Sequence, residues 1–162
     1  MKKIALLSAL LLMVSGVFAQ QTLYRYYNQK LAKHYYTTNF NEYGSGANGW
    51  FLDGPSCMVF DHADRQRGIV PLFRYFNSRV GDHYYTTNFD ELRRGANGYV
   101  LEGPACYIAQ TRGDRLVPLF AYFNRINGDH FLTTNRGEVA HGFEGYAFTG
   151  IAGFVIPVGD RH

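Results

Sequence analysis

The sequence has little from which a catalytic centre could be built. Its 162 residues contain two cysteines and one tryptophan. They contain no G-x-S-x-G elbow, no H-E-x-x-H motif and no C-x-x-C motif, the patterns typical of serine hydrolases, zinc peptidases and thiol oxidoreductases. Both cysteines lie in apolar, strand-like context, where a thiol is not activated as a nucleophile. We therefore expect a protein that is not an enzyme, with no cofactor and no bound metal.

The sequence also lacks a surplus of charge. It has 16 Lys and Arg against 13 Asp and Glu, and without Lys2 and Lys3 the balance is 14 against 13. There is no dense stripe of basic residues, so a nucleic-acid partner is not expected. One apolar run, residues 4–14, is too short to span a bilayer, and no other stretch approaches that length, so membrane insertion is not expected.

The start of the chain has the pattern of a secretory signal. Two lysines precede the apolar run, and Ala19 ends a short stretch of small and apolar residues that suits signal peptidase. We expect residues 1–19 to be a signal peptide, which leaves 143 of the 162 residues, 20–162, as a single domain. No cysteine follows the cleavage point, so a lipid anchor is not expected there. The expected location is secreted, either extracellular or periplasmic.

One pattern occurs three times along the chain. Residues 23–38, 72–87 and 119–134 read LYRYYNQKLAKHYYTT, LFRYFNSRVGDHYYTT and LFAYFNRINGDHFLTT, and their starts are 49 and 47 residues apart. A regular period of this size indicates one supersecondary unit used repeatedly. We place the repeats at residues 23–71, 72–118 and 119–162.

Each repeat is predicted to hold four short strands. In the second repeat these are 72–76, 83–86, 98–101 and 105–109, with a glycine between the last two as a break. A turn ending in Gly81 joins the first two strands, and because the first repeat has Ala32 there its turn should differ. Each repeat also has Asn followed three residues later by Glu, the pattern of a capping box, which predicts one helical turn between strands two and three. A glycine-rich bend follows that turn, at residues 46–49, 95–98 and 142–145.

Three units of four strands favour a β-trefoil, an all-β fold that needs three copies and removes most free sheet edges. A propeller has blades of similar length but typically needs four or more of them. A loose array of three hairpins would leave the 13 Tyr, 13 Phe and single Trp poorly buried. We therefore predict a β-trefoil-like monomer.

The two cysteines, Cys57 and Cys106, occupy the same position in the first and second repeats, and Gly153 stands there in the third. Export permits a disulfide between them. Equivalent positions can be bridged only where they lie near the symmetry axis, since a disulfide spans a short Cα separation. The sequence leaves open whether the cysteines form a disulfide or are two buried free thiols.

The repeated histidines, His34, His83 and His130, allow three interpretations. As structural residues they would orient the hairpins, which is the commonest role of repeated polar positions in a repeat fold. As ligand-binding residues they would line shallow pockets beside aromatic rings, an arrangement suited to sugars. As a metal site they would have to converge on the axis, where polar groups displace apolar core.

The pattern Y-R-[YF]-[YF]-N…G-D-H-[YF]-Y-T-T…G-[WY]…G-P-x-C resembles a family of secreted repeats known as a domain of unknown function. The resemblance covers nearly all of residues 23–156 and implies a β-trefoil-like, lectin-type module. The chain departs from the pattern at Lys33, where the others have Asp, and at Ala121 and Leu132 in the third repeat. The second repeat is the best copy.

We therefore predict a secreted, non-catalytic carbohydrate-binding protein, directed at a cell-wall polymer or surface glycan. Its predicted ligand-binding residues are Asp82, His83, Tyr84, Thr86, Asp129, His130, Phe131, Thr133, His34, Tyr35 and Arg74. The alternative is a protein-interaction module, an adhesin or inhibitor, that uses the variable charged loops 61–68 and 110–115. A small secreted hydrolase is the third and weakest hypothesis.

Overall fold

The computed structural model describes residues 19–139 and 145–159. The predicted signal peptide and most of the bend at 142–145 therefore lie outside the described residues. The chain is all-β, as predicted, with two short helical segments, η1 (Phe40–Glu42) and α1 (Phe89–Leu92). The strands are β1 (Gln20–Asn28), β2 (Lys33–Thr37), β3 (Gly46–Ala47), β4 (Trp50–Phe60), β5 (Ile69–Asn77), β6 (Asp82–Thr86), β7 (Gly95–Ala96), β8 (Tyr99–Ala109), β9 (Val117–Asn124), β10 (His130–Thr133) and β11 (Tyr146–Val155).

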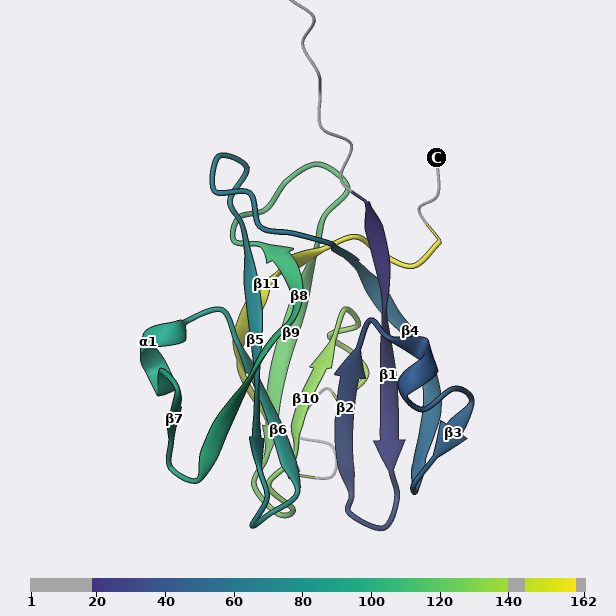
Figure 1. The fold of residues 1–162 in the computed structure, drawn as a ribbon. Coiled ribbons are helices and arrows are strands. Elements are labelled where there is room, and N and C mark those ends of the chain that lie inside the picture. Colours follow the sequence, from purple (N-terminus) through teal and green to yellow (C-terminus); the bar gives the residue numbers. More distant parts are fainter. Residues whose placement is uncertain (1–18, 140–144, 160–162) are drawn as a thin grey trace, which may run out of the picture.

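The long strands pair in three groups of the same order, all antiparallel. β1 lies between β2 and β4, β5 lies between β6 and β8, and β9 lies between β10 and β11. We call these groups the first unit (20–60), the second unit (69–109) and the third unit (117–155). The two-residue strands β3 and β7 add a small hairpin to β4 and β8. In Figure 1 the long strands run from top to bottom of the molecule.

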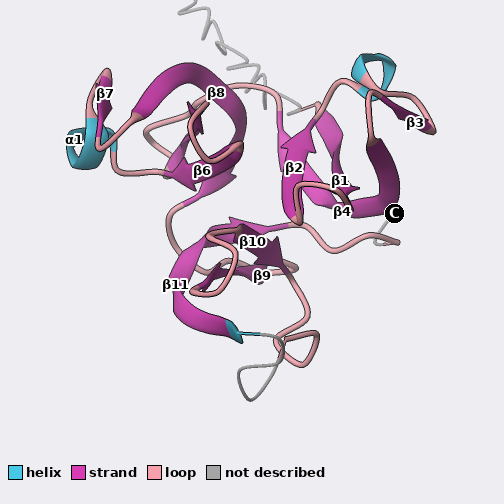
Figure 2. Ribbon diagram, turned by 90° about the horizontal axis from the view of Figure 1, so that it is seen from below, coloured by secondary structure: helices cyan, strands magenta, loops and turns pink. Residues whose placement is uncertain are grey.

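The three units are set around a common centre, as Figure 2 shows in a view from below. Single residue pairs join them, Phe60 with Tyr107 between β4 and β8, and Phe154 with Ala109 between β11 and β8. The result is one open sheet with the path β10-β9-β11-β8-β4-β1-β2. In the described residues the first long strand of each unit, β1, β5 or β9, is paired on both sides within its own unit. None of these strands therefore has a free edge that could pair with another unit and close a barrel. The β-trefoil is therefore not confirmed.

The last strand of each unit is long and irregular. We expected two strands in the second unit, 98–101 and 105–109, but they form the single strand β8, so the predicted break at Gly103 is wrong. The register of β8 against β5 shifts at two places instead. Such β-bulges bend a strand without ending it. Gly103 has a φ of 122°, a conformation that favours glycine and that suits this irregularity.

The repeated asparagines close the first hairpin of each unit. Asn28 Oδ1 accepts a backbone N–H from three residues on, and Asn77 Oδ1 accepts one from two residues on, each at 3.1 Å. These are turn-forming contacts of the kind that Asn makes best. The different turn expected in the first unit is wrong, because Ala32 adopts a φ of 52°, close to the 65° of Gly81. The shared turn forms although a left-handed alanine costs about 1 kcal/mol.

A helical turn follows the second strand of the first two units, as predicted, while residues 136–139 of the third unit form turns. Asn88 caps α1, but the reciprocal half of the capping box is absent. Thr86 Oγ1 instead accepts the N–H of Asn88 at 3.0 Å and donates to Glu91 Oε2 at 3.0 Å. The glutamate is thereby held beside β6. No helix among the described residues has both the length and the apolar character needed to cross a membrane.

All three units contribute to one apolar core. Its buried members are Leu23, Leu72 and Leu119, Tyr36, Tyr85 and Leu132, Val59, Ile108 and Val155, with Cys57 and Cys106. Most of them occupy corresponding positions, so the units pack against one another through the same side-chain rows. Both cysteines are free and buried, which answers the open disulfide question. Burial raises the pKa of the Cys57 thiol to about 12, as expected for an inert thiol.

We predict that Gly153→Ala destabilises the protein by about 2 kcal/mol, because this position has no room for a side chain. A Cβ there would lie 2.6 Å from Ile108 Cδ1 and 2.7 Å from the carbonyl oxygen of Ala109. Gly113→Ala is the matched control, since its nearest neighbour is the flexible end of Leu116 at 3.3 Å. Urea denaturation should give a control change within about 0.5 kcal/mol. Equal effects of the two substitutions would contradict the prediction.

Candidate functional site

Neighbouring units meet at three junctions, which we name 3/1, 1/2 and 2/3 after the units that form them. At each junction a histidine ring lies 4.7 Å from an aromatic ring of the preceding unit. The pairs are His34 with Phe131, His83 with Tyr35, and His130 with Tyr84. The repeated histidines therefore mark the boundaries between units.

A buried aspartate ties the histidine across two of these junctions. At the 3/1 junction Asp129 Oδ2 lies 2.6 Å from His34 Nδ1, and Oδ1 accepts the His34 backbone N–H at 2.7 Å. At the 2/3 junction Asp82 makes the same contacts with His130 at 2.6 and 3.3 Å. Each carboxylate also accepts a tyrosine hydroxyl of its own unit at 2.6 Å. Both aspartates are 0 % exposed, so in this structure neither contacts solvent.

The 1/2 junction lacks this tie, because Lys33 stands where the other units have aspartate. Lys33 is buried, and its Nζ donates to a backbone carbonyl of the third unit at 2.5 Å. The first unit also has Trp50 where the others have the tyrosine that bonds the aspartate. His83 is therefore left with a buried Nδ1 that has no hydrogen-bond partner. Burial, and after it the charge of Arg74, lowers the pKa of His83 to about 4.

An arginine lies in the 3/1 junction. The guanidinium of Arg25 sits 5.0 Å from the centre of the Phe131 ring. Its Nε pairs with Asp53 at 2.6 Å, and a terminal nitrogen pairs with Glu138 of the third unit at 2.8 Å. Ring stacking and two carboxylates together hold this cation between the units.

The 1/2 junction contains the corresponding arginine. Arg74 lies 4.7 Å from the centre of the Tyr35 ring and pairs with Glu102 at 2.6 Å. A terminal nitrogen donates to the carbonyl oxygen of Tyr36 at 3.3 Å. A guanidinium over an aromatic ring of the preceding unit is thus a shared feature of two junctions.

The 2/3 junction has lost this arginine, because Ala121 stands at its position. It has also lost a second contact. At the 3/1 junction the hydroxyl of Tyr36 accepts the N–H of Leu132 at 2.8 Å and donates to its carbonyl at 2.7 Å. Leu132 is itself the counterpart of Tyr36 in the third unit, and it has no hydroxyl to offer the backbone of Tyr85. Two shortened side chains therefore leave space at this junction.

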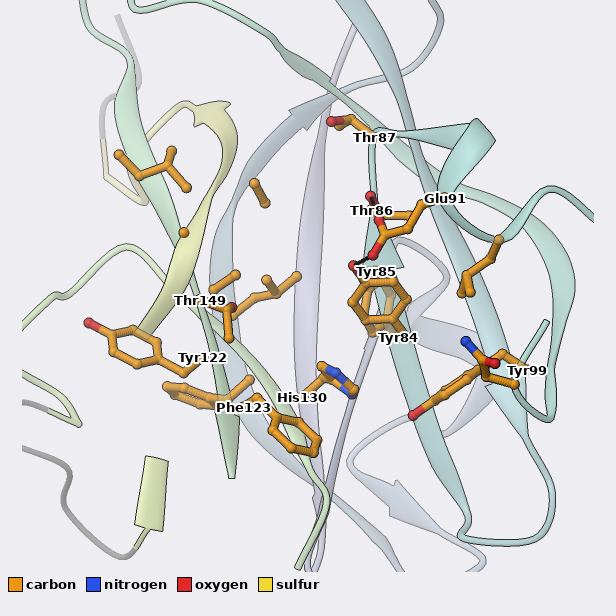
Figure 3. A pocket seen from close by; sticks show the side chains of 18 residues that line it. Tyr84, Tyr85, Thr86, Thr87, Glu91, Tyr99, Tyr122, Phe123, His130 and Thr149 are labelled. Atoms are coloured by element: carbon orange, nitrogen blue, oxygen red, sulfur yellow. Dashed lines mark hydrogen bonds between the residues drawn. The ribbon is translucent and has the colours of Figure 1, made fainter. Parts of the chain in front are cut away.

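A cavity of about 630 Å³ occupies that space. Figure 3 shows residues of the second unit facing residues of the third across it: Tyr84, Glu91 and Tyr99 opposite Phe123, His130 and Thr149. The His130 ring lies 4.7 Å from both Tyr84 and Phe123, so the wall is largely aromatic. Glu91 Oε1 accepts the Tyr84 hydroxyl at 2.7 Å, and no cation pairs with Glu91 in the described part of the chain. Burial raises the pKa of Tyr84 and of Tyr99, so both hydroxyls remain neutral donors.

The predicted site residues fall into three groups. Four of them line the cavity: Tyr84, Thr86, His130 and Phe131. Asp82 and Asp129 are the buried ties. The rest belong to the other junctions: His34, His83, Tyr35, Arg74 and Thr133. The junctions are not equivalent in space, since the 3/1 junction holds two smaller cavities of about 150 and 400 Å³.

Sequence reasoning missed Glu91, Tyr99 and Thr149 as cavity-lining residues. In the sequence Glu91 is marked only as the glutamate of the Asn-to-Glu spacing that predicts a helical turn. A signal was nevertheless present, because Ala121 replaces an arginine at a repeated position and shortening a side chain between packed units opens space. The three histidines lie at separate junctions, and within residues 19–139 and 145–159 no three His, Cys, Asp or Glu side chains form a group that could hold a metal ion.

These observations define a small all-β protein of three like units with a solvent-accessible cavity at one junction. The chain belongs to a family described as a domain of unknown function (DUF5648), whose sequence model matches residues 22–156. This agrees with the family resemblance noted in the sequence. No curated protein and no solved structure matches the chain.

We predict that stability falls as the pH is lowered from 6.5 toward 4. His83 has a pKa of about 4 in the folded protein against 6.5 for an ordinary histidine. Between these values the unfolded chain binds a proton that the folded chain does not, so the free energy of unfolding rises with pH. The effect of His83 on the free energy of unfolding levels off above pH 6.5. At pH 4 the free energy of unfolding is about 3 kcal/mol lower on account of this residue.

The measurement is urea denaturation between pH 4 and 7.5 for the wild type and for His83→Phe. Phenylalanine keeps a ring beside Phe76, on which His83 is stacked at 4.6 Å, but does not titrate. Carboxylates titrate in both proteins, so the difference between the two curves isolates His83. Parallel curves would show that the assignment is wrong.

We also predict that Lys33→Asp restores the missing tie. The new carboxylate would occupy the place that Asp82 and Asp129 have in their units and would accept the unpartnered Nδ1 of His83. A carboxylate within hydrogen-bond distance favours the charged imidazole, so the pKa of His83 should rise by at least about one unit. An NMR titration of the imidazole measures it. Lys33→Met is the control, since it keeps the bulk without an acceptor, and an equally low pKa in both variants would refute the prediction.

Proposed function

We propose that this protein is a secreted, non-catalytic carbohydrate-binding module and that the cavity at the 2/3 junction holds the sugar. The observation that carries the proposal is the cavity itself, about 630 Å³ in volume and larger than either cavity at the 3/1 junction. A volume in this range is typical of sites for small ligands. It is large enough for one or two sugar rings.

The cavity wall supplies the two kinds of contact that sugars need. Aromatic faces from Tyr84, Tyr99 and Phe123 suit the C–H side of a pyranose ring. Hydroxyl, amide and carboxylate groups supply donors and acceptors for the sugar hydroxyls. They come from Thr86, Thr87, Glu91, Asn97 and Thr149. Both kinds of group line the same cavity.

The proposal assigns one carbohydrate-binding site to each chain. The sequence suggested up to three weak, pseudo-equivalent sites, each built on a histidine and its neighbouring aspartate. Because Asp82 and Asp129 are fully buried, they serve in our proposal as ties between units. At the 1/2 and 3/1 junctions Arg74 and Arg25 occupy the space between the units, and the 3/1 junction retains only two smaller cavities. A monomer with one site gains no avidity from a polymer that repeats its epitope, so its affinity is that of the single site.

We predict that the protein binds a subset of a glycan array or a purified cell-wall polymer, and that Thr149→Lys lowers this binding about tenfold or more. The exposed Thr149 lines the cavity, so a long side chain there enters it. Val100→Lys is the matched control, because Val100 is also an exposed strand residue, 64 % accessible, but does not line the cavity. No binding by the wild type, or equal binding by both variants, would count against the proposal.

A protein-interaction surface is the second candidate, and one observation favours it. In the loop 61–68, Asp64 Oδ1 accepts the backbone N–H groups of Gln66 and Arg67 at 2.9 and 3.2 Å, and Gly68 accepts a backbone N–H from Gln110 at 2.9 Å. The loop is thus held in one shape with Arg65 exposed. Exchanging residues 61–68 for a Gly/Ser loop would abolish binding to a protein partner and leave glycan binding unchanged.

A further inference from the structure

The residues that correspond to Ala121 at the other two junctions indicate which chemical group fits the space beside it. Arg25 and Arg74 place a guanidinium there, over an aromatic ring of the preceding unit. The 2/3 junction keeps the ring, Tyr84, but has Ala121, Leu132 and Thr149 at the positions of the arginine, the tyrosine hydroxyl and the carboxylate that pairs with the arginine. The space is therefore shaped by the fold around a planar, positively charged group.

The cavities at the 3/1 junction show that the arginine is what divides the space. Arg25 lines both of them, the one of about 150 Å³ and the one of about 400 Å³. Most of the residues that line them correspond to residues that line the single cavity of about 630 Å³ at the 2/3 junction. Without the guanidinium the 2/3 junction holds one cavity, and its volume of about 630 Å³ exceeds that of the two smaller cavities together.

One carboxylate at the 2/3 junction lacks the cation that its counterpart holds at the 3/1 junction, although Thr149 replaces the carboxylate that pairs with arginine at both other junctions. At the 3/1 junction the third unit supplies Glu138 to Arg25 at 2.8 Å. Its counterpart at the 2/3 junction is Glu91, which lines the cavity and has hydroxyl partners but no cationic partner in the described residues. Each of its oxygens accepts one hydroxyl and retains a lone pair. An exposed carboxylate of this kind attracts an incoming cation, though modestly.

We infer that the cavity at the 2/3 junction binds a guanidinium group from solution, in the place that Arg25 and Arg74 fill from within the chain at the other junctions. The guanidinium stacks on Tyr84, is attracted by Glu91 and donates to the exposed edge of the backbone at Tyr85, as Arg74 donates to Tyr36. A guanidinium is planar and weakly hydrated, so it suits a stacked site better than an ammonium does. This inference goes beyond the proposed function, because it concerns the same cavity at the 2/3 junction but a different class of ligand.

The test is an NMR titration of the protein with methylguanidinium and, separately, with methylurea, its neutral counterpart of the same shape. Methylguanidinium should shift the amide signals of Tyr84, Tyr85 and Glu91 at millimolar concentration, and methylurea should not. Equal shifts with both compounds, or no shift at 50 mM methylguanidinium, would overturn the inference. Methylammonium, titrated in parallel, should bind at least about threefold more weakly.

Three variants test the geometry. Ala121→Arg should abolish binding, because an internal guanidinium then fills the site. Glu91→Gln should weaken binding about threefold to tenfold, since an exposed carboxylate contributes modestly. Thr149→Glu should strengthen it by a similar factor, because Glu102 and Asp53 hold the corresponding position beside Arg74 and Arg25. Thr149 is exposed, so this variant tests the site even if Ala121→Arg does not fold.

A matched gain of binding is expected at another junction. Arg74→Ala should open the 1/2 junction, and methylguanidinium should then bind there and raise the melting temperature of that variant. The wild type has Arg74 in place and should show no shift at Tyr35. Absence of any rescue in Arg74→Ala, together with unchanged binding in Ala121→Arg, would show that the guanidinium binds elsewhere.

The outcomes separate this inference from the proposed function. Guanidinium binding at Tyr84 without any glycan binding would support the cation site and remove the carbohydrate proposal. Glycan binding by the wild type that is lost in Thr149→Lys, with no response to methylguanidinium, would do the reverse. Competition between the two ligands in the wild type would place both in the same cavity.

Discussion

The contact on which the arrangement of the three units depends is the tie between a buried aspartate and the histidine of the next unit. Asp129 and Asp82 are fully buried and satisfy both oxygens through a histidine ring, a backbone N–H and a tyrosine hydroxyl. Burying a carboxylate is expensive unless such partners are present. The tie therefore forms only when two units are docked in one relative orientation. It specifies that orientation, which apolar packing alone would not.

Each junction departs from the common plan in its own way. The 1/2 junction has Lys33 in place of aspartate, which leaves His83 with an unpartnered Nδ1. The 2/3 junction keeps its tie but has Ala121 and Leu132 in place of arginine and tyrosine. The 3/1 junction keeps all of these contacts. Only the change at the 2/3 junction removes volume from between the units, so the cavity opens there, while the apolar core beneath it stays filled from all three units.

The sequence predicted the local structure better than the way the units join. The hairpins, the helical turns of the first two units and the all-β class follow from patterns within some 15 residues, such as the asparagine turns and caps. The β-trefoil required knowing which strand edges pair across units, and nothing in the strand pattern encodes that. Gly103 shows the same limit, since a glycine that ends a strand and one that forms a bulge look alike in sequence.

The sequence by itself determined that the chain is built from three related all-β units, because a period of 49 and 47 residues with recurring Asn, His and Thr is visible without coordinates. It also marked Lys33, Ala121 and Leu132 as the departures. Only the tertiary structure decided what each departure does. The cavity beside Ala121 is bounded on its far side by residues of β6, α1 and β8 of the second unit, so whether the missing bulk leaves a cavity depends on contacts between residues far apart in the chain.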